Sequence, residues 1–241
     1  SNVILQGESP GVTVHWEYSE YAFFVLGIGI DTEVSNVVVH RIRFEAAQMQ
    51  VLWKVLLVAY RCVQLQVTYC EFVVTATTSN HTGLWCIEVS NPTIANNRIQ
   101  NVLAGIWLNN NKDGGYIDIH DNFIEGAFEN NEEVGFISRG YGGITLIELI
   151  NGQIAEQVIC HIENNVIRHF QVGISLNHYA AGSVVIGNHI YYGASSSEQE
   201  HFDVGRLFDE GIEKLTDELD KLSYVIDIAA ADCKVRHNVI D

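Results

Sequence analysis

Two tryptophans stand at equivalent places in two copies of a short motif, in which a glycine is followed by apolar, variable and apolar residues. Trp85 is the variable residue of segment 83–86, and Trp107 is the variable residue of segment 105–108. Because successive side chains of a strand point to opposite faces, the aliphatic residues should point inward and each tryptophan outward. An outward indole ring offers apolar area on which a sugar ring can stack. The motif therefore predicts a saccharide platform.

The same motif recurs at 143–146 and 173–176, which predicts a file of outward side chains across adjacent strands. The outward positions are Val58, Trp85, Trp107, Thr145 and Ser175, followed two residues later by Tyr60, Ile87, Asn109, Ile147 and Asn177. Neighbouring strands lie about 4.8 Å apart, so the two tryptophans should be adjacent and both partly exposed. The groups expected to hydrogen-bond a ligand are Asn109, Thr145, Ser175 and Asn177. In the alternative interpretation, loops or another domain cover this face.

Acids and histidines alternate on two other predicted strands. Asp118 and His120 flank one inward isoleucine, and His161 and Glu163 flank another. In register, Asp118 would lie beside His161 and His120 beside Glu163. Such a group could bind a metal ion or transfer protons. Surface pairing across strands, worth about 0.2–1 kcal/mol a pair, is the favoured interpretation. We therefore predict no metal site and no cofactor, with calcium left open.

These strands belong to a repeat that runs through most of the chain. Five segments share an apolar residue, an asparagine two or three residues later, and an isoleucine two residues after that. The aligned asparagines are Asn97, Asn122, Asn165, Asn188 and Asn238. Ile42 and Cys70 take the same place in two earlier segments. The successive steps are 28, 27, 25, 43, 23 and 50 residues, so four lie near 25 and two contain an insertion.

A unit of about 25 residues with short strands cannot bury its apolar face alone. Each unit should therefore stack on its neighbours in a solenoid. The aligned asparagines would then form a ladder in which each side-chain amide hydrogen-bonds the next. Asparagine also tolerates the left-handed backbone conformation that a sharp corner can require. Ile42 and Cys70 would begin the file as an apolar stack.

The recurring asparagine and glycine motifs together resemble the right-handed parallel β-helix of the pectin-lyase-like superfamily. The resemblance covers nearly the whole chain. It implies an all-β solenoid of about 7–8 turns, forming a single domain over residues 1–241. Two insertions interrupt the repeat. The first, at about 126–142, is predicted to be a loop or hairpin. The second, at 195–222, is predicted to contain an α-helix, because its apolar residues recur at helical spacing.

Composition limits the classes of partner. The 241 residues are 47% hydrophobic and 18% charged, which excludes a disordered chain. Thirty acidic against thirteen basic residues give a net charge of -17, so we expect no nucleic-acid binding. No run of about 18 uncharged apolar residues occurs, so we expect no membrane insertion. The five cysteines form no C-x-x-C pair, which favours buried thiols that act as small hydrophobic groups.

In the resembled family, the sheet with the glycine motif and its flanking loops form the saccharide groove. Calcium-dependent lyases of that family use groove-facing acids and a catalytic arginine. The nearest equivalents are Glu88 and Glu148 beside the groove strands and Arg139 in the first insertion. The clustered aspartates and Arg-x-Lys of polygalacturonase-like hydrolases are absent from the groove strands. The low content of Lys and Arg favours a neutral glycan over polyanionic pectate.

The sequence thus predicts a polysaccharide-binding or polysaccharide-processing β-helix domain. The alternative is a structural or adhesive β-helix segment of a larger surface or phage protein, with no catalysis. A third hypothesis is a carbohydrate enzyme whose catalytic residues lie on the two insertions. The resemblance favours an extracellular or cell-surface location. The abrupt start and end of the repeat lead us to expect flanking domains in a longer parent chain.

Overall fold

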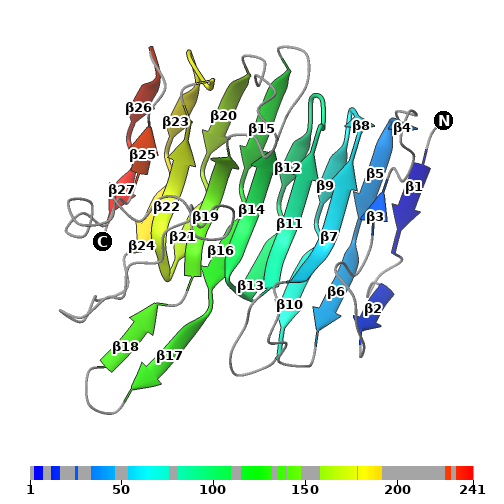
Figure 1. The fold of residues 1–241 in the computed structure, drawn as a ribbon, viewed down its shortest axis with the longest axis horizontal. Helices are drawn as coiled ribbons and strands as arrows, with labels where there is room; N and C mark the ends of the chain where they lie inside the picture. The colour runs from blue at the N-terminus through cyan, green and yellow to red at the C-terminus, as the bar shows by residue number, and fades with distance from the viewer. Residues whose placement is uncertain are drawn as a thin grey trace, which may run out of the picture.

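The computed structural model describes the chain in segments, and every regular element in them is a β-strand. The described residues are 3–7, 12–16, 25–26, 34–46, 54–75, 81–109, 115–131, 135–138, 140–147, 158–177, 179–191, 226–228 and 232–240. Most strands belong to three sheets, which the chain visits in turn (Figure 1). We call one passage through the three sheets a coil.

The three sheets have the following strands. Sheet 1 contains β1 (Val3–Gln6), β5 (Val37–His40), β9 (Gln66–Thr68), β12 (Thr93–Ala95), β15 (Tyr116–His120), β20 (Ile159–Glu163), β23 (Val184–Ile186) and β26 (Lys234–Arg236). Sheet 2 contains β2 (Val12–Trp16), β6 (Ile42–Ala46), β10 (Glu71–Val74), β13 (Arg98–Val102), β16 (Phe123–Gly126), β21 (Val166–Arg168), β24 (His189–Tyr191) and β27 (Val239–Ile240). Sheet 3 contains β3 (Val25–Leu26), β7 (Lys54–Tyr60), β11 (His81–Ile87), β14 (Ala104–Asn109), β19 (Gly140–Ile147), β22 (Phe170–Leu176) and β25 (Ile226–Ile228).

Neighbouring strands within these sheets are parallel, and strands from successive coils pair with each other. A further parallel pair, β4 (Val34–Ser35) and β8 (Cys62–Val63), lies at the corner before sheet 1. The all-β, parallel architecture predicted from the repeat is therefore present. The cyclic order of the sheets is consistent with a parallel β-helix.

An antiparallel hairpin occupies the first predicted insertion. It consists of β17 (Phe128–Asn131) and β18 (Gly135–Ser138), and Figure 1 shows it projecting away from the three sheets. The helix predicted within 195–222 lies outside the described residues. Within the described ranges, no helix has the length and apolar character needed to cross a membrane.

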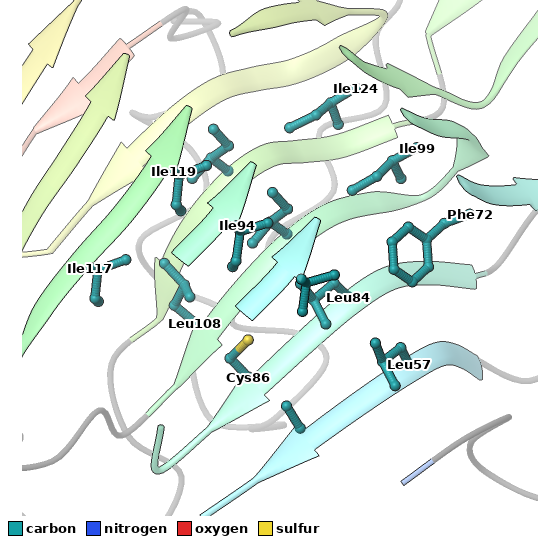
Figure 2. Packing of buried hydrophobic residues seen from close by; sticks show 14 of the residues in the cluster. Leu57, Phe72, Leu84, Cys86, Ile94, Ile99, Leu108, Ile117, Ile119 and Ile124 are labelled. Carbon is teal, nitrogen blue, oxygen red and sulfur yellow. The ribbon is translucent and has the colours of Figure 1, made fainter. Parts of the chain in front are cut away.

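Inward side chains stack in columns along the solenoid (Figure 2). Sheet 1 contributes Ile94 and Ile119, sheet 2 contributes Ile99 and Ile124, and sheet 3 contributes Leu108, all of which are 0% exposed. The two isoleucine pairs lie directly opposite each other on adjacent strands. Burial of apolar area, at about 25 cal/mol per Å², is the main force that holds successive coils together.

The glycine of the recurring motif is required by close packing in the sheet 3 strands β11, β14 and β19. A Cβ atom at Gly105 would lie 2.3 Å from the carbonyl oxygen of Gly143 and 2.5 Å from Cγ2 of Ile124. Both distances are far inside van der Waals contact. The missing side chain therefore makes room for the inward isoleucine of β16, the sheet 2 strand of the next coil.

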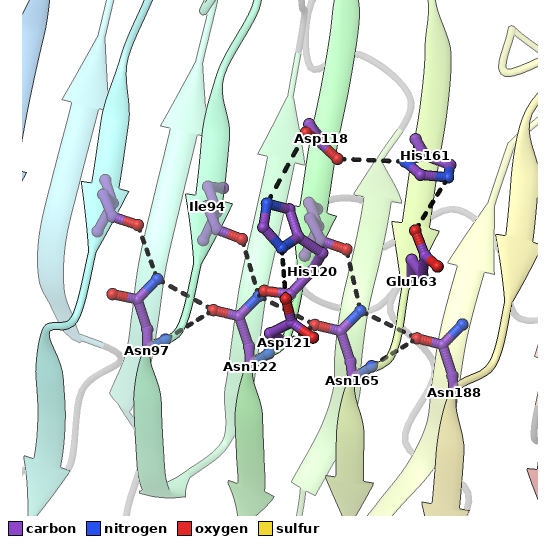
Figure 3. Close-up of polar contacts among 12 residues, drawn as sticks. Ile94, Asn97, Asp118, His120, Asp121, Asn122, His161, Glu163, Asn165 and Asn188 are labelled. Atoms are coloured by element: carbon purple, nitrogen blue, oxygen red, sulfur yellow. Dashed lines mark hydrogen bonds and ion pairs between the residues drawn. The ribbon is translucent and has the colours of Figure 1, made fainter.

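The five aligned asparagines form a hydrogen-bonded ladder at the corner between sheets 1 and 2, and Figure 3 shows Asn97, Asn122, Asn165 and Asn188. Nδ2 of each donates to Oδ1 of the next, at 3.0 Å from Asn97 to Asn122 and at 2.9 Å in the later steps to Asn165, Asn188 and Asn238. The same oxygen accepts the backbone N–H of the preceding ladder residue, as in Asn97 N to Asn122 Oδ1 at 3.0 Å. Each oxygen thereby satisfies two donors that the corner would otherwise bury unpaired.

The second amide hydrogen of each rung binds the backbone of sheet 1, as Asn122 Nδ2 does when it donates to the carbonyl of Ile94 at 2.8 Å. Cys70 begins the file. Its backbone N–H donates to Asn97 Oδ1 at 2.9 Å, and its thiol donates to the carbonyl of Val39 at 3.5 Å. The buried thiol thus takes the place of an amide, and Ile42 and Cys70, the two residues predicted to begin the file, are both buried.

The left-handed residue of this corner is the one before each ladder asparagine. The φ angle is 57° at Asn96, 56° at Asp121, 53° at Asn164 and 54° at His237, and all four residues are exposed. The left-handed conformation that a sharp corner can require therefore falls one residue before each ladder asparagine. The chain changes direction where the side chain can point to solvent. The next residue then carries its amide inward to bind the neighbouring coils.

Candidate functional site

The register of sheet 3 confirms the predicted file of outward residues. Trp85 lies opposite Val58 on β7 and Trp107 on β14. Trp107 lies opposite Thr145, which in turn lies opposite Ser175. Asn109 occupies the next outward position on β14, between Ile87 and Ile147. The two tryptophans are therefore neighbours on one side of the sheet.

The expectation that both tryptophans would be partly exposed is wrong for Trp107, which is only 1% exposed. Asn109, expected to meet a ligand, is 2% exposed, and its Oδ1 has no hydrogen-bond partner among the described residues. Val58 of β7, which lies opposite Trp85, is also buried, at 7% exposed. Parallel sheets are commonly covered on both faces, and this part of sheet 3 follows that rule. An enclosed indole cannot receive a sugar ring.

Trp85 remains half-buried. Its ring meets that of Trp107 edge to face, with centroids 6.5 Å apart and planes at 83°. Such a pair contributes about 0.5–1.5 kcal/mol beyond area burial, so Trp107 holds the Trp85 ring in place. Thr145 and Ser175, farther along the file, are half-buried as well.

Asn177 is also half-buried, but its side chain already has a partner. Its Oδ1 accepts the backbone N–H of Tyr179 at 3.2 Å. This contact makes Asn177 part of the turn after β22. Its amide nitrogen remains the group that could reach a ligand.

Of the three catalytic candidates, only Glu88 lies in the part of the chain that the structure describes. Glu88 forms an ion pair with Arg61, in which Nε of Arg61 donates to Oε2 of Glu88 at 2.6 Å. Both residues have left-handed backbone, with φ of 52°, so the pair fastens successive coils at the corner after sheet 3. Glu148 and Arg139 lie outside the described residues.

The acid and histidine group on sheet 1 has the predicted register, with Asp118 opposite His161 and His120 opposite Glu163 (Figure 3). His161 lies between two carboxylates, with Nδ1 3.3 Å from Asp118 Oδ1 and Nε2 3.5 Å from Glu163 Oε2. The nearest partner of His120 is Asp121, at 2.8 Å. Among the described residues, no group of three or more His, Cys, Asp and Glu side chains is arranged to hold a metal ion. Asp118 and His161 pair across adjacent strands, whereas the contacts of His161 with Glu163 and of His120 with Asp121 lie within one coil.

A buried histidine and a buried lysine are the first residues of two neighbouring strands of sheet 3, β11 and β7. His81 is opposite Lys54, and the two are 0% and 5% exposed. Burial and, to a smaller extent, the nearby Lys54 charge together lower the pKa of His81 to about 4. The imidazole is therefore neutral at pH 7. Neither residue stood out in the sequence, because nothing marks this end of the strand as covered.

The thiols have pKa values unsuited to nucleophilic chemistry. Burial raises the pKa of Cys62 and Cys70 to about 11 and that of Cys160 to about 12. Burial also raises the pKa of Cys86. All five cysteines are free, and Cys233 is the half-buried exception. Since the thiolate is the reactive form, the four buried thiols act as packing groups, as predicted.

Sequence reasoning missed a cavity of about 330 Å³ beside sheet 1. It is lined by Asn36, Val38, Gln64, Gln66, Asn91 and Thr93. The available signal was the spacing of 28 and 27 residues between the three corner amides, which follows the repeat. No motif pointed to it, because the three corner residues are of two types.

No protein-family model matches the chain, and neither the curated proteins nor the solved structures include a match to it.

Proposed function

We propose that this chain is a glycan-binding domain with a right-handed parallel β-helix fold of about 7–8 coils, related to the pectin-lyase-like superfamily. The asparagine ladder, the glycine motif and the three parallel sheets support the relationship. An experimental structure with left-handed coils, or with a different number of them, would contradict this assignment.

The single observation that carries the binding function is the environment of Trp85. Its half-buried ring is held edge to face by the buried Trp107 and stands in file with Thr145 and Ser175. A ring held in this way can stack on a sugar with little loss of side-chain entropy, while hydroxyl groups in the same file hydrogen-bond the ligand. We therefore propose a single-tryptophan platform in place of the pair.

The ligand proposed is a neutral glycan. The net charge of -17 repels polyanions at long range. Within the described part of the file, the polar side chains are hydroxyls and amides. Binding without catalysis is the form that the described geometry supports, since Glu88 is engaged by Arg61.

The test is isothermal titration of neutral and acidic hexasaccharides into the wild type and Trp85→Ala. We expect the neutral ligand to bind and Trp85→Ala to weaken binding about tenfold, because the ring supplies most of the apolar contact. Tyr69→Asn is the matched control. It removes an exposed aromatic ring at another corner, and asparagine tolerates the positive φ there. Equal binding by Trp85→Ala and the wild type would remove the platform.

A second candidate function is a structural or adhesive β-helix segment. The burial of Trp107, Asn109 and Val58 on the outward side of sheet 3 favours it, because a covered face stabilises a scaffold and leaves little room for a groove. Failure of every glycan to bind in the same titration would favour this structural or adhesive function over glycan binding.

A further inference from the structure

The cavity beside sheet 1 lies on a different surface from Trp85. It extends over three consecutive coils, at the corner where the chain enters β5, β9 and β12. These strands are adjacent in sheet 1 (Figure 1). Its volume of about 330 Å³ is at the small end of the range of about 300–1,000 Å³ typical of ligand sites. It can therefore hold a short segment of a ligand.

Two files of side chains build the cavity. The corner file consists of Asn36, Gln64 and Asn91, whose φ angles of 52°, 56° and 49° turn the chain sharply at the same point of each coil. The strand file lies two residues farther on and consists of Val38, Gln66 and Thr93, which are paired in register. Adjacent strands are about 4.8 Å apart. Each coil thus repeats a polar position at a spacing close to the length of one sugar residue.

The chemistry of the lining is neutral. Four of the six lining residues carry amides, and none is Lys or Arg. Gln64 and Gln66 are exposed, and neither side-chain amide has a hydrogen-bond partner within the described residues. The residue in register after Thr93 is Asp118, so an anionic ligand would meet an acid and no cation. An amide offers both donors and an acceptor, as a sugar hydroxyl does.

An exposed aromatic ring borders the same surface. The backbone N–H of Tyr116 donates to Asn91 Oδ1 at 2.9 Å, which fixes Tyr116 next to the corner file. Tyr116 is 47% exposed, and its ring stacks on His161 with centroids 6.3 Å apart. The free face of such a ring can bury the apolar side of a sugar.

We propose that this cavity binds a neutral saccharide along the solenoid axis, with the side-chain amides of Gln64 and Gln66 on its hydroxyls and Tyr116 as the stacking ring at one end. The site is a second glycan contact and does not depend on the Trp85 platform.

The test is a titration of isotope-labelled protein followed by NMR of the backbone amides. The ligands are cellohexaose and maltohexaose, which are neutral, and hexagalacturonate, which is anionic. We expect a neutral ligand to shift the backbone signals of Gln66 and Thr93, and hexagalacturonate to leave them in place. Gln66→Ala should weaken this binding about fivefold, the worth of one hydrogen bond. Gln64→Gly should act similarly, because glycine keeps the positive φ.

Gln100→Ala is the matched control. It removes an amide from β13 of sheet 2, where Gln100 Oε1 accepts from Arg98 and its Nε2 donates to Glu125. We expect the affinity of this variant to be unchanged. No shift at Gln66 and Thr93 with either neutral ligand, or tighter binding of hexagalacturonate there, would overturn the proposal.

The two glycan sites fail separately. Shifts confined to Trp85 and its neighbours would overturn the sheet 1 site and leave the proposed function standing. Shifts at Gln66 that persist in Trp85→Ala would support the sheet 1 site, whatever becomes of the platform. Equal affinities of Gln66→Ala and the wild type would contradict the proposed hydrogen bond between the Gln66 amide and the saccharide.

Discussion

The corner between sheets 1 and 2 and the outward face of sheet 3 arise from the same repeat, yet they differ in what determines them. At the corner, each ladder asparagine contacts only the coils beside it, as Asn122 does with Asn97 and Asn165. On sheet 3, Trp107 is buried although its register places it outward. A ladder depends on contacts between successive coils. The exposure of an outward residue depends on whatever else lies over the sheet.

The largest expected effect is a loss of stability that differs between the two tryptophans. Trp107→Ala should lower the free energy of unfolding by about 3–5 kcal/mol, because it empties a fully enclosed site. Trp85→Ala should cost about 1–2 kcal/mol, because its half-buried ring loses less apolar contact. Denaturant titration of both variants measures the difference. Equal losses would mean that the two rings have the same environment.

The buried His81, the first residue of β11, should make the free energy of unfolding depend on pH. The pKa of His81 is about 4 in the folded protein against 6.5 in the unfolded chain, so the unfolded chain binds the extra proton first. Above pH 6.5, the neutral imidazole makes its full contribution to the free energy of unfolding. This contribution falls as the pH drops toward about 4, by about 3 kcal/mol in total.

Denaturant titrations at a series of pH values check this slope, with His81→Gln as the comparison. The variant removes the titrating group, so its stability should change less between pH 6.5 and 4 than that of the wild type. The same pH dependence in both proteins would show that His81 is not the group responsible.

The ladder corner should respond to loss of a single rung. Asn122→Ala leaves Asn97 without its acceptor and the carbonyl of Ile94 without its donor, so it should cost about 1–3 kcal/mol. Asn96→Gly, one residue before a rung, keeps the positive φ and should cost far less. Thermal melts measure both variants. No loss in Asn122→Ala would remove the ladder as a source of stability.

The smallest expected effect is on the outward surface of sheet 1. His161→Gln should change the free energy of unfolding by less than about 1 kcal/mol, since its pairs with Asp118 and Glu163 lie on the surface. Unfolding curves with and without added zinc check this. A stabilisation by zinc that His161→Gln abolishes would turn these pairs into a metal site.

The sequence predicted the ladder and the register because both follow from spacing within the repeat. The positions of Asn97, Asn122 and Asn165 determine which coils meet, and period-2 alternation places Trp85 beside Trp107. The exposure of Trp107 could not be predicted in the same way. One signal was present, however. Residues 55–59 are continuously apolar, as is typical of a parallel strand covered on both faces.

The backbone of the corners was harder to predict than their side chains. Left-handed conformation falls on Asn96 and Asn164, but also on Asp121 and His237, because the position requires exposure and a tight turn rather than one residue type. The same variety hid the cavity, whose corner file mixes Asn36 and Asn91 with Gln64. The corner file repeats the same geometry in each coil with different residue types, so it could be recognised only in the folded chain.

The most direct test of the account is fluorine NMR of protein labelled with fluorotryptophan, assigned by Trp→Phe variants. The account predicts that the Trp85 signal responds to exchange of water for deuterated water and shifts when cellohexaose or maltohexaose is added. The Trp107 signal should show no solvent response. A solvent-exposed Trp107, or a Trp85 signal that no neutral glycan moves, would contradict the division of roles between the two rings.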